Sequence, residues 1–232
     1  PRFQTFSLAL LVTLFVAVTS PAATLVRNNQ PAAVLALPAE PDEHERLAAK
    51  ELAEHIEKIS GAKIDSATVN AADVEKFLAS SKSAGRIPVF LGRNIRDRVK
   101  LTATAPRGAF ALHVTADSVM IAGAEEGTTF GALELLEQLG CRWFMPGDLG
   151  TVIPKLATVE VREQQTTQTP SFPSRWFQMP DRDWQARVRC SGPAFPGAHG
   201  LPAPKLAVDK TTKEFADPEA AKMFALLKGK RS

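Results

Sequence analysis

The chain has 232 residues, which is enough for one complete domain and part of another, and its formal net charge is +3. Hydrophobic residues make up 44% and charged residues 23%, the composition of an ordinary soluble globular protein. Its most basic stretch is short and terminal (Lys228, Lys230 and Arg231), which argues against nucleic acid as a partner. No CxxC, HExxH or phosphate-loop motif occurs, so the sequence predicts neither a cofactor nor a metal site.

The first residues have the pattern of an export signal. Arg2 precedes an apolar run over residues 8–18, and small residues follow up to Ala22 and Ala23. The run is shorter than the about 20 apolar residues that span a bilayer, although an uncleaved anchor is the alternative. We therefore expect residues 1–23 to be a signal peptide and the mature protein to be secreted or periplasmic, without a membrane segment. Pro1 is not a translation start, and we expect the polypeptide to extend beyond both ends.

The next hundred residues alternate between strand and helix patterns. Residues 33–37 read as a strand, and residues 42–60 have apolar positions at helical spacing, with Gly61 as the end signal. Glu51, Glu54 and Lys58 are expected on the solvent face of this helix. Residues 64–69 form a second predicted strand, residues 73–80 a short helix, and the continuous apolar run 87–91 a buried strand.

The following residues complete an α+β domain. Residues 110–115 and 119–123 alternate apolar and polar side chains around a short turn, which predicts a hairpin. A Leu-rich helix follows, with Thr128 or Thr129 as its cap and Gly140 as its end. Short strands are predicted at 142–144 and 157–161. We expect a mixed β-sheet with two main helices packed on one face, forming a domain over residues 24–162.

The string GTTFGALELLEQLG, residues 127–140, resembles the last helix of the small domain that precedes the catalytic barrel in family 20 glycoside hydrolases. A related domain precedes the barrel in alpha-glucuronidases. The longer string through residue 154 is most similar to large secreted bacterial proteins that carry a domain of unknown function and are taken to be glycoside hydrolases. The resemblance implies an accessory domain packed on a barrel.

Beyond this domain the composition changes. Residues 163–168 lack apolar side chains, so we interpret residues 163–170 as a linker. The string SFPSRW, residues 171–176, resembles the first barrel strand of family 20 enzymes. A (β/α)₈ barrel takes about 250 residues, so residues 171–232 are expected to hold only its truncated start.

Glycoside hydrolysis usually requires two carboxyl groups. The adjacent acid pairs after the signal are Asp42–Glu43 and Glu125–Glu126, and each precedes a predicted helix without following a buried strand. We therefore assign both pairs structural roles and expect no catalytic acids here.

Four residues are candidates for sugar binding: Arg175, Trp176, Trp184 and His199. The resemblance implies that Arg175 contacts substrate hydroxyls, although Trp176 stands where the family usually has glycine. An ion pair at a domain junction is the alternative for Arg175, and core packing is the alternative for the tryptophans. His199 lies in a glycine- and proline-rich loop. His44, His55 and His113 are expected on solvent faces, without a ligand role.

The sequence thus predicts the N-terminal, non-catalytic region of an exported glycoside hydrolase whose partner is an oligo- or polysaccharide. Taken alone, the chain is expected to be inactive. A stand-alone carbohydrate-binding module and a cell-envelope interaction domain are the alternatives. Cys141 and Cys190 permit one disulfide, but Cys141 is expected to act as a small buried hydrophobic residue.

Overall fold

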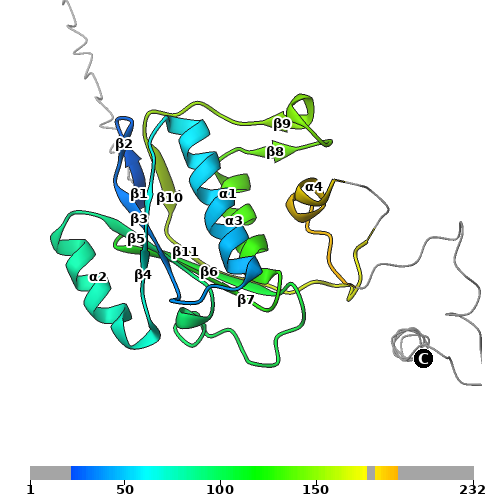
Figure 1. Ribbon diagram of the computed structural model, residues 1–232, viewed down its shortest axis with the longest axis horizontal. Helices are drawn as coiled ribbons and strands as arrows, with labels where there is room; N and C mark the ends of the chain where they lie inside the picture. Colours follow the sequence, from blue (N-terminus) through cyan, green and yellow to red (C-terminus); the bar gives the residue numbers. More distant parts are fainter. Residues whose placement is uncertain (1–21, 177–180, 193–232) are drawn as a thin grey trace, which may run out of the picture. The chain divides into compact units, whose positions relative to one another are not determined.

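The computed structural model describes residues 22–176 and 181–192 (Figure 1). The chain divides into two compact units, of which the first ends at Ser171 and the second begins at Phe172. In the first unit, a six-stranded sheet has the strand order β11-β6-β7-β5-β3-β4. Its strands are β3 (Ala33–Leu37), β4 (Asp65–Thr68), β5 (Ile87–Leu91), β6 (Phe110–Thr115), β7 (Ser118–Gly123) and β11 (Gln164–Gln168).

This sheet is mixed, as predicted. Strands β7, β5, β3 and β4 are parallel, because the connections between them pass through helices or a long loop. The tight turn at Ala116–Asp117 makes β6 antiparallel to β7, and β11 is antiparallel to β6. The predicted hairpin and the buried strand 87–91 are confirmed.

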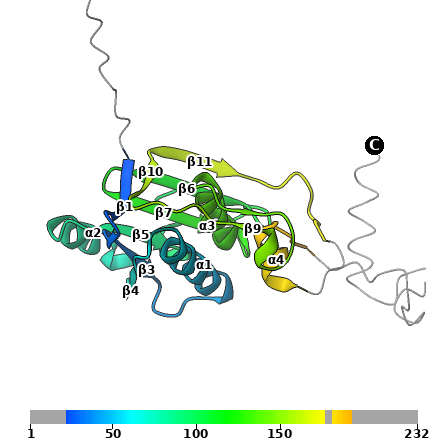
Figure 2. The same cartoon turned by 90° about the horizontal axis from the view of Figure 1, so that it is seen from above.

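The two main helices, α1 (Glu43–Ser60) and α3 (Gly127–Gln138), pack against each other on one face of the sheet (Figure 2). Close approach of α3 depends on Gly131, because a Cβ there would lie 2.5 Å from the Ile121 side chain. Helix α2 (Val74–Ser83) covers part of the opposite face, where Phe77 meets Phe90 edge to face. The α+β class and the placement of α1 and α3 are therefore confirmed.

Smaller strands complete the first unit. A three-stranded sheet contains β1 (Ala22–Arg27), β2 (Gln30–Pro31) and β10 (Val159–Arg162), and a hairpin contains β8 (Arg142–Trp143) and β9 (Thr151–Val152). Strand β1 begins at Ala22, inside the predicted signal peptide. Because Ala23 is fully buried and pairs with Val161, a boundary between residues 23 and 24 divides a strand.

The predicted linker is wrong at the level of local structure. Residues 164–168 form β11, which pairs with β6 from Phe110 to Val114. Their polar side chains suit an edge strand, where half-exposed positions do not need to be apolar. Lack of apolar residues was therefore not a sign of irregular structure here.

Three predictions about helix surfaces are also wrong. Glu51 and His55 of α1 are buried, because the helix faces Trp143 of the β8–β9 hairpin as well as the sheet. Thr128 and Thr129 lie inside α3 and are buried, whereas Glu126 occupies the N-cap position without a side-chain cap. The Thr129 hydroxyl instead donates to the backbone oxygen of His44, which joins the starts of α1 and α3.

In the second unit, the described residues include helix α4 (Arg182–Arg187) and a backbone bridge between Arg175 and Ser191. Asp181 caps α4, because its carboxylate accepts from the Trp184 N–H at 2.8 Å. No barrel is present among the described residues, and most of the predicted barrel start lies outside them.

Candidate functional site

The crevice between β3 and β5 lies at the carboxyl ends of two neighbouring parallel strands. Connections leaving these neighbouring parallel strands pass to opposite faces of the sheet: α1 lies on one face, and the segment after β5 lies on the other. Such a topological switch point, at the carboxyl ends of the strands, is where open α/β sheets commonly bind ligands.

Here the crevice is filled by a side chain of the protein. Glu45, in the first turn of α1, is only 2% exposed, and its carboxylate accepts from the N–H groups of Asp42 and Arg93, each at 2.8 Å. It occupies the space that a Cβ on Gly92 would need. The Arg93 guanidinium lies 3.6 Å from the same carboxylate and donates to the Glu40 backbone oxygen. Glu45 thus uses the backbone N–H of Arg93, which follows the end of β5, for the structure of the protein itself.

Both adjacent acid pairs are part of helix starts. Asp42 caps α1 and accepts from the Glu45 N–H at 2.8 Å, completing a capping box. Glu126, at the start of α3, is bound by the Arg107 guanidinium, whose Nε donates to it at 2.8 Å. Arg107 Nε also lies 3.1 Å from Glu125. Burial has the largest single effect and raises the pKa of Glu126, but the Arg107 hydrogen bond, the Glu126 backbone N–H and the Arg107 charge together outweigh it and leave the pKa lowered. A lowered pKa is unsuited to a general acid, which must hold a proton at working pH.

A second group of polar residues is enclosed between α1, the end of α3 and β8. His55 Nδ1 lies 2.9 Å from the Glu51 backbone oxygen and 3.4 Å from its carboxylate, and the His55 ring meets the Trp143 ring edge to face at 5.3 Å. Cys141 is fully buried nearby, and burial raises the pKa of its thiol to about 11. Neither Cys141 nor Cys190 is in a disulfide. A protonated, enclosed thiol is a poor nucleophile, so this group is structural.

The predicted sugar-binding residues belong to the second unit. The Arg175 guanidinium donates to the backbone oxygens of Phe172 at 2.9 Å and Arg189 at 3.2 Å. These bonds hold the segment around the Arg175–Ser191 bridge together. Trp176 and Trp184 are half-buried, the latter in α4. His199 lies outside the described residues. A sugar-binding role for these four residues stays a prediction.

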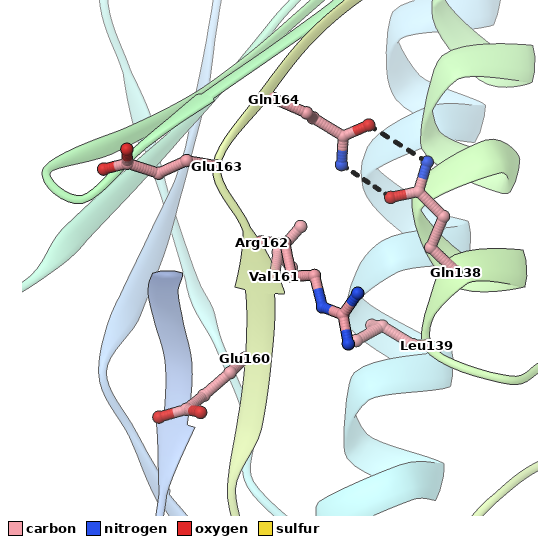
Figure 3. Close-up of a pocket in the computed structure, with 7 residues that line it drawn as sticks. All are labelled: Gln138, Leu139, Glu160, Val161, Arg162, Glu163 and Gln164. Carbon is pink, nitrogen blue, oxygen red and sulfur yellow. Dashed lines mark hydrogen bonds between the residues drawn. The ribbon is translucent and has the colours of Figure 1, made fainter. Parts of the chain in front are cut away.

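A groove with a different character lies between the end of α3 and the junction of β10 and β11 (Figure 3). Its volume is about 580 Å³, within the roughly 300–1,000 Å³ of small-molecule sites. The lining residues are Gln138, Leu139, Glu160, Val161, Arg162, Glu163 and Gln164. Sequence reasoning missed this groove because its residues come from segments read as a helix end, a strand and a linker.

The two glutamines of the groove face each other as an amide pair. Gln138 Nε2 donates to Gln164 Oε1 at 3.2 Å, and Gln164 Nε2 donates to Gln138 Oε1 at 2.6 Å. Figure 3 shows the Arg162 side chain directed toward Leu139, whereas Glu160 and Glu163 point to the other side of the strand. Arg162 therefore faces the end of α3.

A second hollow lies where α1 ends and is lined by Asn29, residues 57–61 and residues 155–157. Its polar side chains are used by the helix: Asn29 donates to the Ser60 oxygen at 2.6 Å and Lys155 to the Lys58 oxygen at 2.6 Å. These bonds satisfy carbonyls that a helix end leaves free. This hollow is a capping arrangement.

Within the described ranges, 22–176 and 181–192, no group of three or more His, Cys, Asp or Glu side chains could hold a metal ion. Within the same ranges, no helix has the length and apolar character needed to cross a membrane.

No family model matches the chain, and no curated protein matches it. Among solved structures, it is similar to a family 115 4-O-methyl-alpha-glucuronidase with specificity for decorated arabinogalactans, at 19% identity and a TM-score of 0.47, over 66% of this chain and 19% of that one. A family 20 exo-β-N-acetylglucosaminidase from Vibrio harveyi matches at 19% identity and a TM-score of 0.40, over 68% and 18% of the two chains. A family 20 β-N-acetylhexosaminidase from Streptomyces coelicolor A3(2) matches at 15% identity and a TM-score of 0.41, over 68% and 26%.

The solved structures to which the chain is similar thus include family 20 hexosaminidases and an alpha-glucuronidase, over about two thirds of this chain. The chain spans between 18% and 26% of the length of these proteins. At such low identity the likeness concerns the fold alone.

Proposed function

We propose that the first unit, from β1 to Ser171, is a non-catalytic accessory domain of an exported glycoside hydrolase, and that the residues after it begin the catalytic barrel. The non-catalytic assignment rests on one observation: acidic side chains of the first unit are bonded at the starts of its helices. Asp42 and Glu45 hold the start of α1, and Glu126 is bound by Arg107. The glycoside hydrolase assignment rests on the resemblance of residues 127–154, which form α3 and the β8–β9 hairpin.

The surface of the first unit supports a place within a larger protein. Of the seven exposed large hydrophobic side chains among the described residues, five lie between residues 144 and 156: Phe144, Met145, Leu149, Val152 and Leu156. Leu149 is fully exposed. Exposed apolar side chains concentrated in this way are typical of surface that another part of a protein covers.

The catalytic part of this proposal is tested by incubating the purified chain with a panel of aryl glycosides. We expect release of the aryl group at the rate of an enzyme-free control, because Asp42 and Glu126, from the two adjacent acid pairs, are held at helix starts and glycoside hydrolysis usually needs two available carboxyl groups. Steady turnover that scales with protein concentration would show that the chain carries its own catalytic acids. A Glu126→Gln variant then tells whether the acid pair at the start of α3 is responsible.

Export is tested separately by expressing the full sequence in a bacterium and sequencing the N-terminus of the exported protein. We expect the mature chain to start at Ala23 or Thr24, because small residues precede these positions. Replacing Leu10 by Arg interrupts the apolar run and should retain the protein in the cytoplasm. Equal export of this variant would show that the run is not a signal.

A further inference from the structure

The groove between α3 and the β10–β11 junction offers hydrogen-bonding groups that the described fold does not use. Arg162 lines it, and within the described part of the chain its guanidinium has neither a hydrogen bond nor an ion pair. A guanidinium presents several N–H donors in a fixed plane, so this side chain is equipped to hold an oxygen-rich ligand.

The amide pair adds one donor and one acceptor. Both N–H groups of Gln138 are used, by Gln164 Oε1 at 3.2 Å and by Glu134 Oε1 at 3.1 Å. Gln164 Nε2 gives one N–H to Gln138, and its oxygen also accepts from Thr166 at 3.4 Å. Counting the groups of two amides leaves one N–H on Gln164 and one lone pair on Gln138. Because each amide holds the other, these two remaining groups have defined positions.

The charges around the groove favour a neutral ligand over an anion. Glu160 and Glu163 line the groove with their side chains turned away, and Glu134 stands next to Gln138. Three carboxylates against one guanidinium make the surroundings unfavourable for a phosphate or a carboxylate. A sugar hydroxyl both donates and accepts, so it matches the free N–H, the free lone pair and the guanidinium together.

We infer that this groove is a binding site for a neutral sugar unit, with Arg162 as its main contact, the Gln138–Gln164 pair as its orienting contact and Leu139 as an apolar side. The site lies on the first unit and needs no catalytic residue, so it goes beyond the proposed accessory role. Because the groove is open and supplies few contacts, we expect a dissociation constant of about 1–10 mM.

The test is an NMR titration of the full chain, labelled with ¹⁵N, with methyl β-glucoside as the neutral probe and methyl β-glucuronide as its carboxylate-bearing match. We expect saturable shifts of the Gln138 and Gln164 side-chain amides with the glucoside, and weaker binding of the glucuronide. Arg162→Ala should weaken glucoside binding roughly fivefold or more, since hydrogen bonds to a charged group are the stronger ones. Arg27→Ala, which removes another exposed arginine, should leave the affinity unchanged.

Several results would overturn the inference. The first is an absence of saturable shifts at glucoside concentrations well above the expected dissociation constant. The second is unchanged affinity in a folded Arg162→Ala protein. The third is tighter binding of the glucuronide, which would indicate an anion site. Loss of binding in Trp184→Ala but not in Arg162→Ala would place the sugar on the second unit. The glycosidase assay measures turnover and this titration measures binding, so failure of one leaves the other intact.

Discussion

The crevice between β3 and β5 and the groove beside β10 and β11 differ in how their polar groups are satisfied. In the crevice, Glu45 and Arg93 satisfy each other and the neighbouring backbone, at the position where related sheet topologies bind ligands. In the groove, the Arg162 guanidinium is left available by the described residues. The comparison teaches that topology alone does not locate a site, because a single buried side chain can close the expected one.

The largest effect is expected from Glu45→Ala, which empties the crevice. The change leaves the N–H groups of Asp42 and Arg93 without their acceptor and a hollow beside Gly92. We expect a loss of about 3 kcal/mol in the free energy of unfolding, measured by urea denaturation. Glu43→Ala, on the exposed side of the same turn, is the matched control and should cost about 0.5 kcal/mol or less. Similar losses of unfolding free energy in both variants would mean that the buried Glu45 carboxylate stabilises the fold no more than the exposed Glu43 carboxylate.

The pH dependence of stability tests whether the buried thiol of Cys141 is a structural group. Its pKa is raised by burial to about 11, whereas an unfolded thiol titrates near 8.5. Because the folded-state pKa is the higher one, stability is complete below about pH 8.5 and falls as the pH rises toward 11, by about 2–3 kcal/mol. Cys141→Ala should remove this alkaline decline in urea midpoints. In a Cys190→Ser background, rapid alkylation of native Cys141 at pH 8 would show that the thiol is accessible after all.

The ion pair at the start of α3 is expected to have a smaller effect. The pKa of Glu126 is lowered, so its contribution is present above the unfolded carboxyl pKa of about 4.3 and is lost as the pH falls. Arg107→Ala should lower the free energy of unfolding by about 0.5–1 kcal/mol at neutral pH, since Arg107 is partly exposed. The same change should reduce the fall of this free energy at low pH. Arg98→Ala, which removes a pair whose carboxylate, Glu75, is more exposed than Glu126, is the control. If the free energy of unfolding falls equally at low pH in Arg107→Ala and in the unchanged protein, other carboxylates are responsible for the fall.

The smallest effect on stability is expected in the groove. Arg162→Ala should change the free energy of unfolding by less than about 0.5 kcal/mol, because the side chain has no bond to lose within the described residues. Thermal unfolding followed by circular dichroism measures this. A melting temperature lowered as much as in Glu45→Ala would show that Arg162 is structural, and would remove the contrast between the two regions.

Elements with a clear local pattern were predictable. The apolar spacing of α1, the continuous run of β5 and the alternation of the β6–β7 hairpin are properties of neighbouring residues, and all three are confirmed. Strand β11 was not predictable in this way, because its polar residues form a strand only by pairing with β6, some 50 residues earlier. Its partner lies too far along the chain for local periodicity to indicate it.

The candidate sites were less predictable than the fold. Structural use of the two acid pairs could be expected, because helix starts favour acidic residues. Burial of Glu45, Glu51 and His55 could not be expected, since three polar residues on one helix usually face solvent. The groove escaped prediction for a related reason: Gln138, Arg162 and Gln164 meet only where α3 ends beside the passage from one sheet to the other.

By itself, the sequence determined the α+β class, the principal helices and strands, and the resemblance of residues 127–154 to glycoside hydrolase accessory domains. Only the tertiary structure decided that Glu45 closes the crevice between β3 and β5 and that Arg162 faces an open groove. The physical reason is the range of the interactions: periodicity records which face of an element is buried, whereas the partner of a polar side chain depends on packing between distant segments.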